Sequence, residues 1–130
     1  MKTVLFVDDH EVLARLSCEI LEMQGYRAIS AYNAADALAK LAHQKIDILV
    51  TDWKMEGMDG LELARTVHER DPSIPVIIVT SYAPIDTGTE VAAWLPKVEL
   101  FPSLVDKIEF LLGKAESDED EEEIAPARRA

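Results

Sequence analysis

The sequence has very little cysteine and no long apolar run. Cys18 is the only cysteine among 130 residues, so no internal disulfide can form and a reducing compartment is favoured. We expect Cys18 to be a small buried side chain on a helix. No apolar run approaches the roughly 20 residues that cross a membrane, and Asp8 and Asp9 interrupt the only early one. These absences predict a cytoplasmic protein without membrane insertion.

Basic residues are also scarce. The chain has 13 lysines and arginines and 25 aspartates and glutamates, which gives a net charge of −12. This balance argues against direct binding to nucleic acid or to anionic membranes, since both need a basic surface. Seven of the eight residues from Glu116 to Glu123 are acidic. We predict one folded domain over residues 1–114 and an acidic disordered tail over residues 115–130, which either solubilises the protein or attracts a basic partner.

Apolar runs and helical periodicity alternate along the chain. Strands are predicted at residues 4–7, 27–32, 46–51, 76–80 and 91–95. Helices are predicted at residues 10–24, from Asn33, at residues 60–70 and from near Pro102–Ser103, where Asp106 completes a start signal. This alternation predicts an α/β fold, a doubly wound five-stranded parallel sheet with helices on both faces.

Two segments carry more specific expectations about this fold. The apolar residues of the first helix that share helical spacing are Val12, Leu16, Ile20 and Met23. We expect this stripe to face the core. The segment from Ser81 to Glu90 contains proline, glycine and threonine, which form helices poorly. The fourth helix is therefore predicted to be short or absent.

Charged and polar residues follow the predicted strands. They are Asp8 and Asp9 after the first strand, Asp52 after the third, Thr80 after the fourth and Lys97 after the fifth. The carboxyl ends of parallel strands share one edge of a sheet, which is where ligands bind in such folds. Three carboxylates repel one another, so their meeting requires a cation or a reaction. Each of these residues also has a purely structural explanation. Asp8 or Asp9 could cap the first helix. Thr80 could instead be a plain strand residue, and Lys97 a surface lysine.

With these residues in this order, the chain resembles the receiver domains of bacterial response regulators, the CheY-like family. The segment from Asp52 to Gly60 reads DWKMEGMDG and is similar to the family pattern D-x-x-M-P-x-M-D-G. The resemblance covers residues 2 to 113. It implies a flavodoxin-like parallel sheet with the strand order 2-1-3-4-5.

The resemblance implies a phosphoacceptor in a two-component signal transduction system. Asp52 would take a phosphoryl group from a sensor histidine kinase or a phosphotransfer protein, with Mg²⁺ as cofactor. Asp9, Asp52 and the main-chain carbonyl of Lys54 would bind the metal directly, and Asp8 through a water. The chain would be a stand-alone receiver, or a piece of a larger regulator. It would catalyse only its own phosphorylation and dephosphorylation, and it would switch binding to a downstream target protein.

The family implies further roles around this pocket. Lys97 and Thr80 would each bind a phosphoryl oxygen. Thr80 would then move inward together with Trp94, the aromatic residue three positions before the lysine. Lys54 and Tyr82 occupy the positions that tune the lifetime of the phosphoryl group. Because both side chains are bulky, we predict slow self-dephosphorylation.

The chain also departs from the family pattern. Val98 follows Lys97 where the family has proline, and Glu56 replaces the usual proline in the loop after Asp52. These departures leave open a phosphorylation-silent, receiver-like binding module. A Mg²⁺-dependent phosphate-ester hydrolase is disfavoured because Lys54 occupies the position of its second acid. A flavin-binding domain is disfavoured because no phosphate-binding loop rich in Gly, Ser and Thr follows the first strand.

Overall fold

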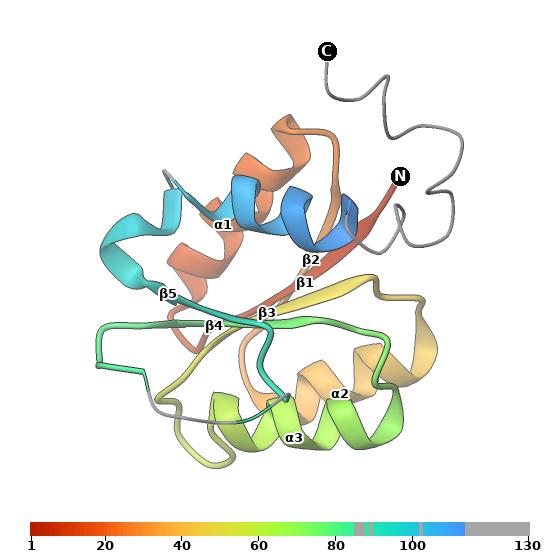
Figure 1. The fold of residues 1–130 in the computed structure, drawn as a ribbon, viewed down its shortest axis with the longest axis vertical. Coiled ribbons are helices and arrows are strands. Elements are labelled where there is room, and N and C mark those ends of the chain that lie inside the picture. Colours follow the sequence, from red (N-terminus) through yellow and green to blue (C-terminus); the bar gives the residue numbers. More distant parts are fainter. Residues whose placement is uncertain (85–87, 89, 102, 114–130) are drawn as a thin grey trace.

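The computed structural model describes residues 1–84, 88, 90–101 and 103–113, which form a five-stranded parallel sheet covered on both faces (Figure 1). The strands are β1 (Thr3–Val7), β2 (Arg27–Ala31), β3 (Ile48–Asp52), β4 (Val76–Thr80) and β5 (Ala93–Pro96). Their order is β2-β1-β3-β4-β5, and every neighbouring pair is parallel. The predicted fold class and strand order are confirmed.

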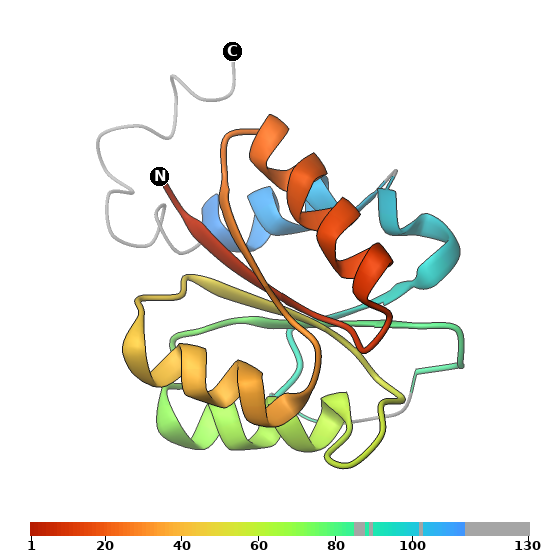
Figure 2. The same cartoon turned by 180° about the vertical axis from the view of Figure 1, so that it is seen from behind.

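Helices form one layer on each side of this sheet. The labelled helices are α1 (Glu11–Met23), α2 (Ala34–His43) and α3 (Gly60–Arg70), and residues 103–113 are also helical. Figures 1 and 2 show α1 and the helix over residues 103–113 on one face, with α2 and α3 on the other. Two hydrophobic clusters, one under each helical layer, form the core.

The sequence of each element explains its place. Strands β1, β3 and β4 are buried along their whole length, as expected of the central strands of a parallel sheet. Three polar side chains cap the helices. His10 caps α1, Asn33 caps α2, and Asp59 forms a capping box with Glu62 at the start of α3.

Three of the four residues in the stripe predicted for the first helix are exposed, and the fourth, Ile20, is half-buried. Val12, Leu16 and Met23 are 52%, 47% and 81% exposed, respectively. The buried residues of α1 are Ala14, Ser17, Cys18 and Leu21, which include the buried cysteine expected from the sequence. Both sets have helical spacing, so periodicity alone could not choose between them. In the structure Ala14, Cys18 and Leu21 pack into the hydrophobic cluster on this face of the sheet.

The connection from β4 to β5 is irregular wherever it is described. Residues 81–84, 88 and 90–92 contain no helical residue, which agrees with a short or absent fourth helix over the described part of the predicted Ser81–Glu90 segment. Strand β5 begins at Ala93 rather than at residue 91. Its carboxyl end leads into η1, a 3-10 turn over Lys97–Glu99.

The last helix begins earlier than its sequence signal. Residues 100 and 101 are already helical, so the helix begins slightly before the predicted start near Pro102–Ser103. The 3-10 turn leads directly into this helix. Leu100, Leu104 and Ile108 are buried on the face of the sheet that α1 also covers. Residues 114–130, which include the predicted acidic tail, lie outside the described residues. Within the described part of the chain, none of the helices combines the length and apolarity needed to span a bilayer.

Candidate functional site

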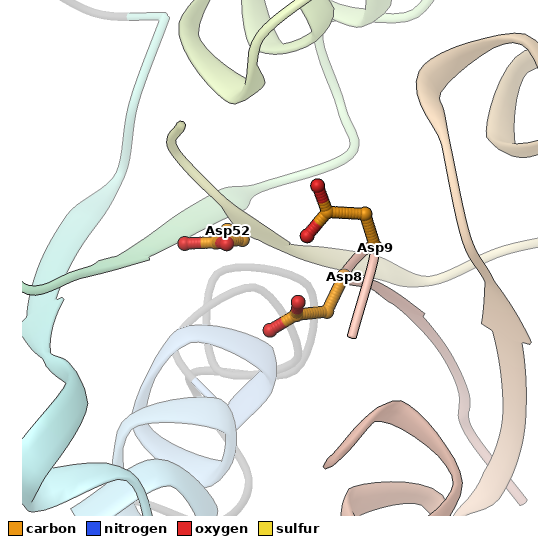
Figure 3. A group of neighbouring side chains, drawn as sticks. All are labelled: Asp8, Asp9 and Asp52. Carbon is orange, nitrogen blue, oxygen red and sulfur yellow. The ribbon is translucent and has the colours of Figure 1, made fainter. Parts of the chain in front are cut away.

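Three carboxylates gather at the carboxyl edge of the sheet (Figure 3). Asp8 and Asp9 follow β1, and Asp52 is the last residue of β3. One carboxylate oxygen from each of the three lies within 4.8 Å of the other two. Asp8 and Asp52 are only 2% and 8% exposed, whereas Asp9 is exposed. The structure therefore brings together the three acids that the sequence predicted to meet.

Backbone amides fix the two buried carboxylates. Asp8 Oδ1 accepts a hydrogen bond of 2.9 Å from the amide of His10, and Asp52 Oδ1 accepts one of 2.9 Å from the amide of Trp53. The cap of α1 is His10, whose Nδ1 accepts from the amide of Leu13 at 3.2 Å. The alternative that Asp8 or Asp9 serves as the helix cap is therefore wrong.

Lys97 supplies the positive charge of this pocket. Its Nζ lies 3.5 Å from Asp8 Oδ2 and 3.3 Å from Asp52 Oδ2, so each buried carboxylate turns its second oxygen to the ammonium. The side chain is 28% exposed, and the surface-lysine alternative is wrong. Val98 follows in place of the family's proline, and the described residues contain no cis peptide bond. Lys97 reaches the acids without that proline.

The charges shift the protonation of the site in defined directions. Burial raises the pKa of Asp52 above its usual value of 3.8, and the charge of Asp8 raises it further. Lys97 and the hydrogen bond from Trp53 oppose this rise. Burial lowers the pKa of Lys97, but Asp8 and Asp52 outweigh it and raise that pKa overall. The surroundings therefore favour the protonated form of Lys97 and disfavour ionisation of Asp52.

Two glycines shape the loop that follows Asp52. Gly57 has a φ of 79°, in the left-handed region that favours glycine. The amide of Gly60 donates to the carbonyl of Trp53 at 2.7 Å. A Cβ on Gly60 would overlap the carbonyl oxygen of Asp52, so only glycine lets α3 begin this close to the strand end.

Thr80 ends β4 at the same edge of the sheet. The strand register pairs Asp52 with Val79, so Thr80 lies one residue further along the neighbouring strand. Thr80 is 3% exposed, and its Oγ1 accepts a hydrogen bond of 2.9 Å from the amide of Tyr82. Its hydroxyl therefore has a defined partner in this structure.

An aromatic cluster beside the pocket was missed by sequence reasoning. The ring centroid of Trp53 lies 5.1 Å from that of Trp94 and 6.1 Å from that of Tyr82, both in edge-to-face geometry. Lys54 Nζ lies 4.0 Å from the centroid of the Trp53 ring and 6.0 Å from that of Tyr82. The sequence pointed to Lys54, Tyr82 and Trp94 one by one, but not to their contact with Trp53. Their meeting depends on the sheet register and on the irregular β4–β5 connection, neither of which periodicity specifies.

Comparison with known proteins gives a consistent result. The family model of the response regulator receiver domain matches residues 4–94. Among curated proteins, the chain is 34% identical over 85 residues to the response regulator receiver protein CpdR of Brucella abortus, which covers 65% of this chain and 71% of that protein. It is 36% identical over 87 residues to the transcriptional regulatory protein ZraR of Klebsiella oxytoca, covering 67% of this chain. The chain spans only 20% of the length of ZraR.

Solved structures share this fold. A CheY-like receiver domain protein from Methanospirillum hungatei superposes with a TM-score of 0.85 at 28% identity, covering 91% of this chain and 98% of that one. The response regulator TrrA of Thermotoga maritima, solved with Mg²⁺ and BeF, has a TM-score of 0.79 at 28% identity, covering 85% and 99%. TrrA has also been solved in complex with the histidine kinase ThkA, with a TM-score of 0.79 at 29% identity over 86% of this chain and 99% of that one.

Proposed function

This chain belongs to the response regulator receiver domain family, and we propose that it acts as a phosphoacceptor in which Asp52 takes a phosphoryl group from a phosphohistidine. One observation carries the proposal: Asp52 Oδ2 lies 3.3 Å from Lys97 Nζ, inside a cluster of three carboxylates whose oxygens lie within 4.8 Å. A buried carboxylate beside an ammonium and two further acids has the arrangement that phosphoryl transfer requires, a nucleophile with charge neutralisation around it.

The transfer itself is a displacement at phosphorus. An oxygen of Asp52 forms a P–O bond as the P–N bond of the phosphohistidine breaks, and the imidazole leaves with the bonding electrons. Lys97 is placed to compensate charge on a phosphoryl oxygen. The Thr80 hydroxyl would donate to another phosphoryl oxygen, because its O–H is not used in the bond that it accepts from the Tyr82 amide.

The donor set fits Mg²⁺. Three carboxylates and one ammonium leave an excess of two negative charges in the pocket, and Mg²⁺ prefers oxygen donors from one or two carboxylates together with waters. Asp9, Asp52 and the main-chain carbonyl of Lys54 would bind the ion directly, with Asp8 acting through a water. When bound, the ion would neutralise charge on the phosphoryl oxygens. Asp9 is exposed, which leaves this side of the pocket open to solvent.

The partners of the reaction follow from the family. A sensor histidine kinase or a phosphotransfer protein would supply the phosphoryl group, as the complex between TrrA and ThkA supports. Phosphorylation would then switch binding to a downstream target protein through Thr80 and Trp94. Lys54 and Tyr82 would slow hydrolysis by covering the phosphoryl group. We place this chemistry in the cytoplasm, without direct nucleic-acid contact, and we regard self-dephosphorylation as the only other reaction of the chain.

The phosphorylation-silent module is the weaker hypothesis. It rested on Val98 and Glu56, which depart from the family pattern. Neither residue prevents Lys97 from contacting Asp8 and Asp52. A silent module would not need the contacts of Lys97 with Asp8 and Asp52, yet this chain has both contacts.

The test is phosphorylation by a small donor. The protein is incubated with Mg²⁺ and acetyl phosphate, and its intact mass is followed in wild type, Asp52→Asn and Asp106→Asn. Asp106 is an exposed acid on the helix over residues 103–113 and serves as the matched control. We expect one phosphoryl adduct in wild type and in Asp106→Asn, and none in Asp52→Asn. A wild-type protein that forms no adduct would support the silent module instead.

A further inference from the structure

Trp53 joins the nucleophile to the aromatic cluster. Its backbone amide donates a hydrogen bond of 2.9 Å to Asp52 Oδ1. Its indole is 8% exposed and packs edge-to-face on Trp94, with the ring centroids 5.1 Å apart. One residue therefore contacts both the reactive carboxylate and the aromatic side chain of β5.

The indole is held by further contacts from a second segment. Tyr82, which follows β4, meets the Trp53 ring edge-to-face at 6.1 Å, and Lys54 Nζ lies 4.0 Å from the centroid of that ring. Aromatic pairs prefer this T-shaped geometry, and a cation over an indole face is attracted by the ring. Residues that follow β3, belong to β5 and follow β4 thus converge on one side chain.

The amide of Trp53 donates to two acceptors at once. Besides the bond to Asp52 Oδ1, it donates to the carbonyl oxygen of Val79 at 3.2 Å, which is the next bond of the β3–β4 ladder. A small displacement of residue 53 would shift this shared N–H away from the carboxylate and toward the Val79 carbonyl. Asp52 would then lose the hydrogen bond that holds Oδ1 and turns Oδ2 to Lys97.

On the basis of the proposed function, we propose that Trp53 is a positioning residue: the packing of its indole on Trp94 fixes its amide, and the amide orients the Asp52 carboxylate for phosphoryl transfer. The coupling is reciprocal. A partner that displaces Trp94 would change the reactivity of Asp52, and a change at Asp52 would loosen Trp94. The coupling between Trp94 and Asp52 runs through Trp53, the residue next to the nucleophile. The described residues that connect β4 to β5 form no helix.

The decisive variant is Trp94→Leu, because Trp94 has no described hydrogen bond or ion pair with the site. We expect it to lower the rate constant for phosphorylation by acetyl phosphate about tenfold, less than the roughly 100-fold that a 1 Å misplacement of a reacting group can cost. Trp53→Ala should lower it similarly, and the double variant should show no further loss. Trp53→Phe keeps an aromatic partner for Trp94 and should retain most of the rate. Phe110→Ala, an exposed aromatic residue outside the cluster, should leave it unchanged.

A second readout needs no phosphorylation. The hydrogen-exchange rate of the residue 53 amide reports its hydrogen bonds, and it should rise in Trp94→Leu but not in Phe110→Ala. Thermal unfolding of each variant checks that the fold is kept. Wild-type phosphorylation and an unchanged exchange rate in Trp94→Leu would overturn the inference, as would additive losses in the double variant. Absence of an adduct in wild type would refute the proposed function, and the exchange rate would still decide this inference.

Discussion

Replacement of the proposed nucleophile should make the protein more stable. Asp52 is a buried carboxylate near two other acids, and burial and Asp8 both raise its pKa. A carboxyl group whose pKa is raised on folding binds its proton more tightly in the folded state than in the unfolded state. Its ionisation therefore costs stability as the pH rises from 3.8 to the raised value, and the cost is complete above that value. Asp52→Asn removes this cost.

The distances give the size of the gain. Carboxylate oxygens within 4.8 Å repel by about 3.5 kcal/mol at an effective dielectric of about 20, and Asp52 has two such neighbours, Asp8 and Asp9. The ammonium of Lys97 at 3.3 Å attracts Asp52 by about 5 kcal/mol on the same scale. Solvent screens the exposed Asp9, so repulsion and attraction roughly cancel. The net cost of the Asp52 charge then comes mainly from its burial, which is the largest cause of its raised pKa. We expect Asp52→Asn to raise the free energy of unfolding by about 1–2 kcal/mol.

Urea or thermal unfolding at pH 7 in the presence of EDTA measures this difference. A gain of 1–2 kcal/mol corresponds to a rise in the midpoint temperature of about 4–8 °C. The difference in unfolding free energy between Asp52→Asn and wild type should shrink as the pH falls through the raised pKa of Asp52, because the wild-type carboxylate then becomes neutral. Addition of Mg²⁺ should also narrow it by stabilising the wild type. Asp106→Asn should change stability by less than about 0.5 kcal/mol. A destabilised Asp52→Asn protein at pH 7 would refute the electrostatic reasoning.

Three further predictions concern the loops and the pH dependence of the site. The rate of phosphorylation by acetyl phosphate should fall as the pH drops, with a midpoint above 3.8, because the reactive form of Asp52 is the carboxylate and its pKa is raised; a midpoint at or below 3.8 would contradict this. Tyr82→Ala should hasten decay of the phosphorylated protein, followed by intact mass after removal of acetyl phosphate, and an unchanged decay rate would count against shielding by this ring. Gly60→Ala should destabilise the protein by about 1–3 kcal/mol, since its Cβ would overlap the Asp52 carbonyl oxygen. Gly113→Ala, where a Cβ meets nothing within 4 Å, is the matched control.

The sheet and the acidic pocket were predictable from short-range patterns. Continuous apolar runs mark β1, β3 and β4 because both of their faces are covered. Asp8, Asp9 and Asp52 follow two of these strands, and parallel topology is enough to bring them to one edge. The fold class and the gathering of the three acids therefore needed no knowledge of side-chain packing.

Packing decided the features that were predicted incorrectly or missed. In α1 two stripes have helical spacing, and the structure buries the one that contains Ala14, Cys18 and Leu21. The 3-10 turn after β5 moved the start of the last helix ahead of Ser103. The contact between Trp53 and Trp94 depends on residues 41 positions apart in the sequence, and local periodicity carries no information about such a pair.

The central claim is that Asp52 is the phosphoacceptor, and chemical trapping tests it most directly. After incubation with Mg²⁺ and acetyl phosphate, reduction with sodium borohydride converts an aspartyl phosphate to homoserine, which peptide mass mapping locates. We predict homoserine at position 52 and at no other aspartate, and none when Mg²⁺ is removed with EDTA. Homoserine at Asp8 or Asp9, or its absence from a protein that carries a phosphoryl adduct, would contradict the assignment.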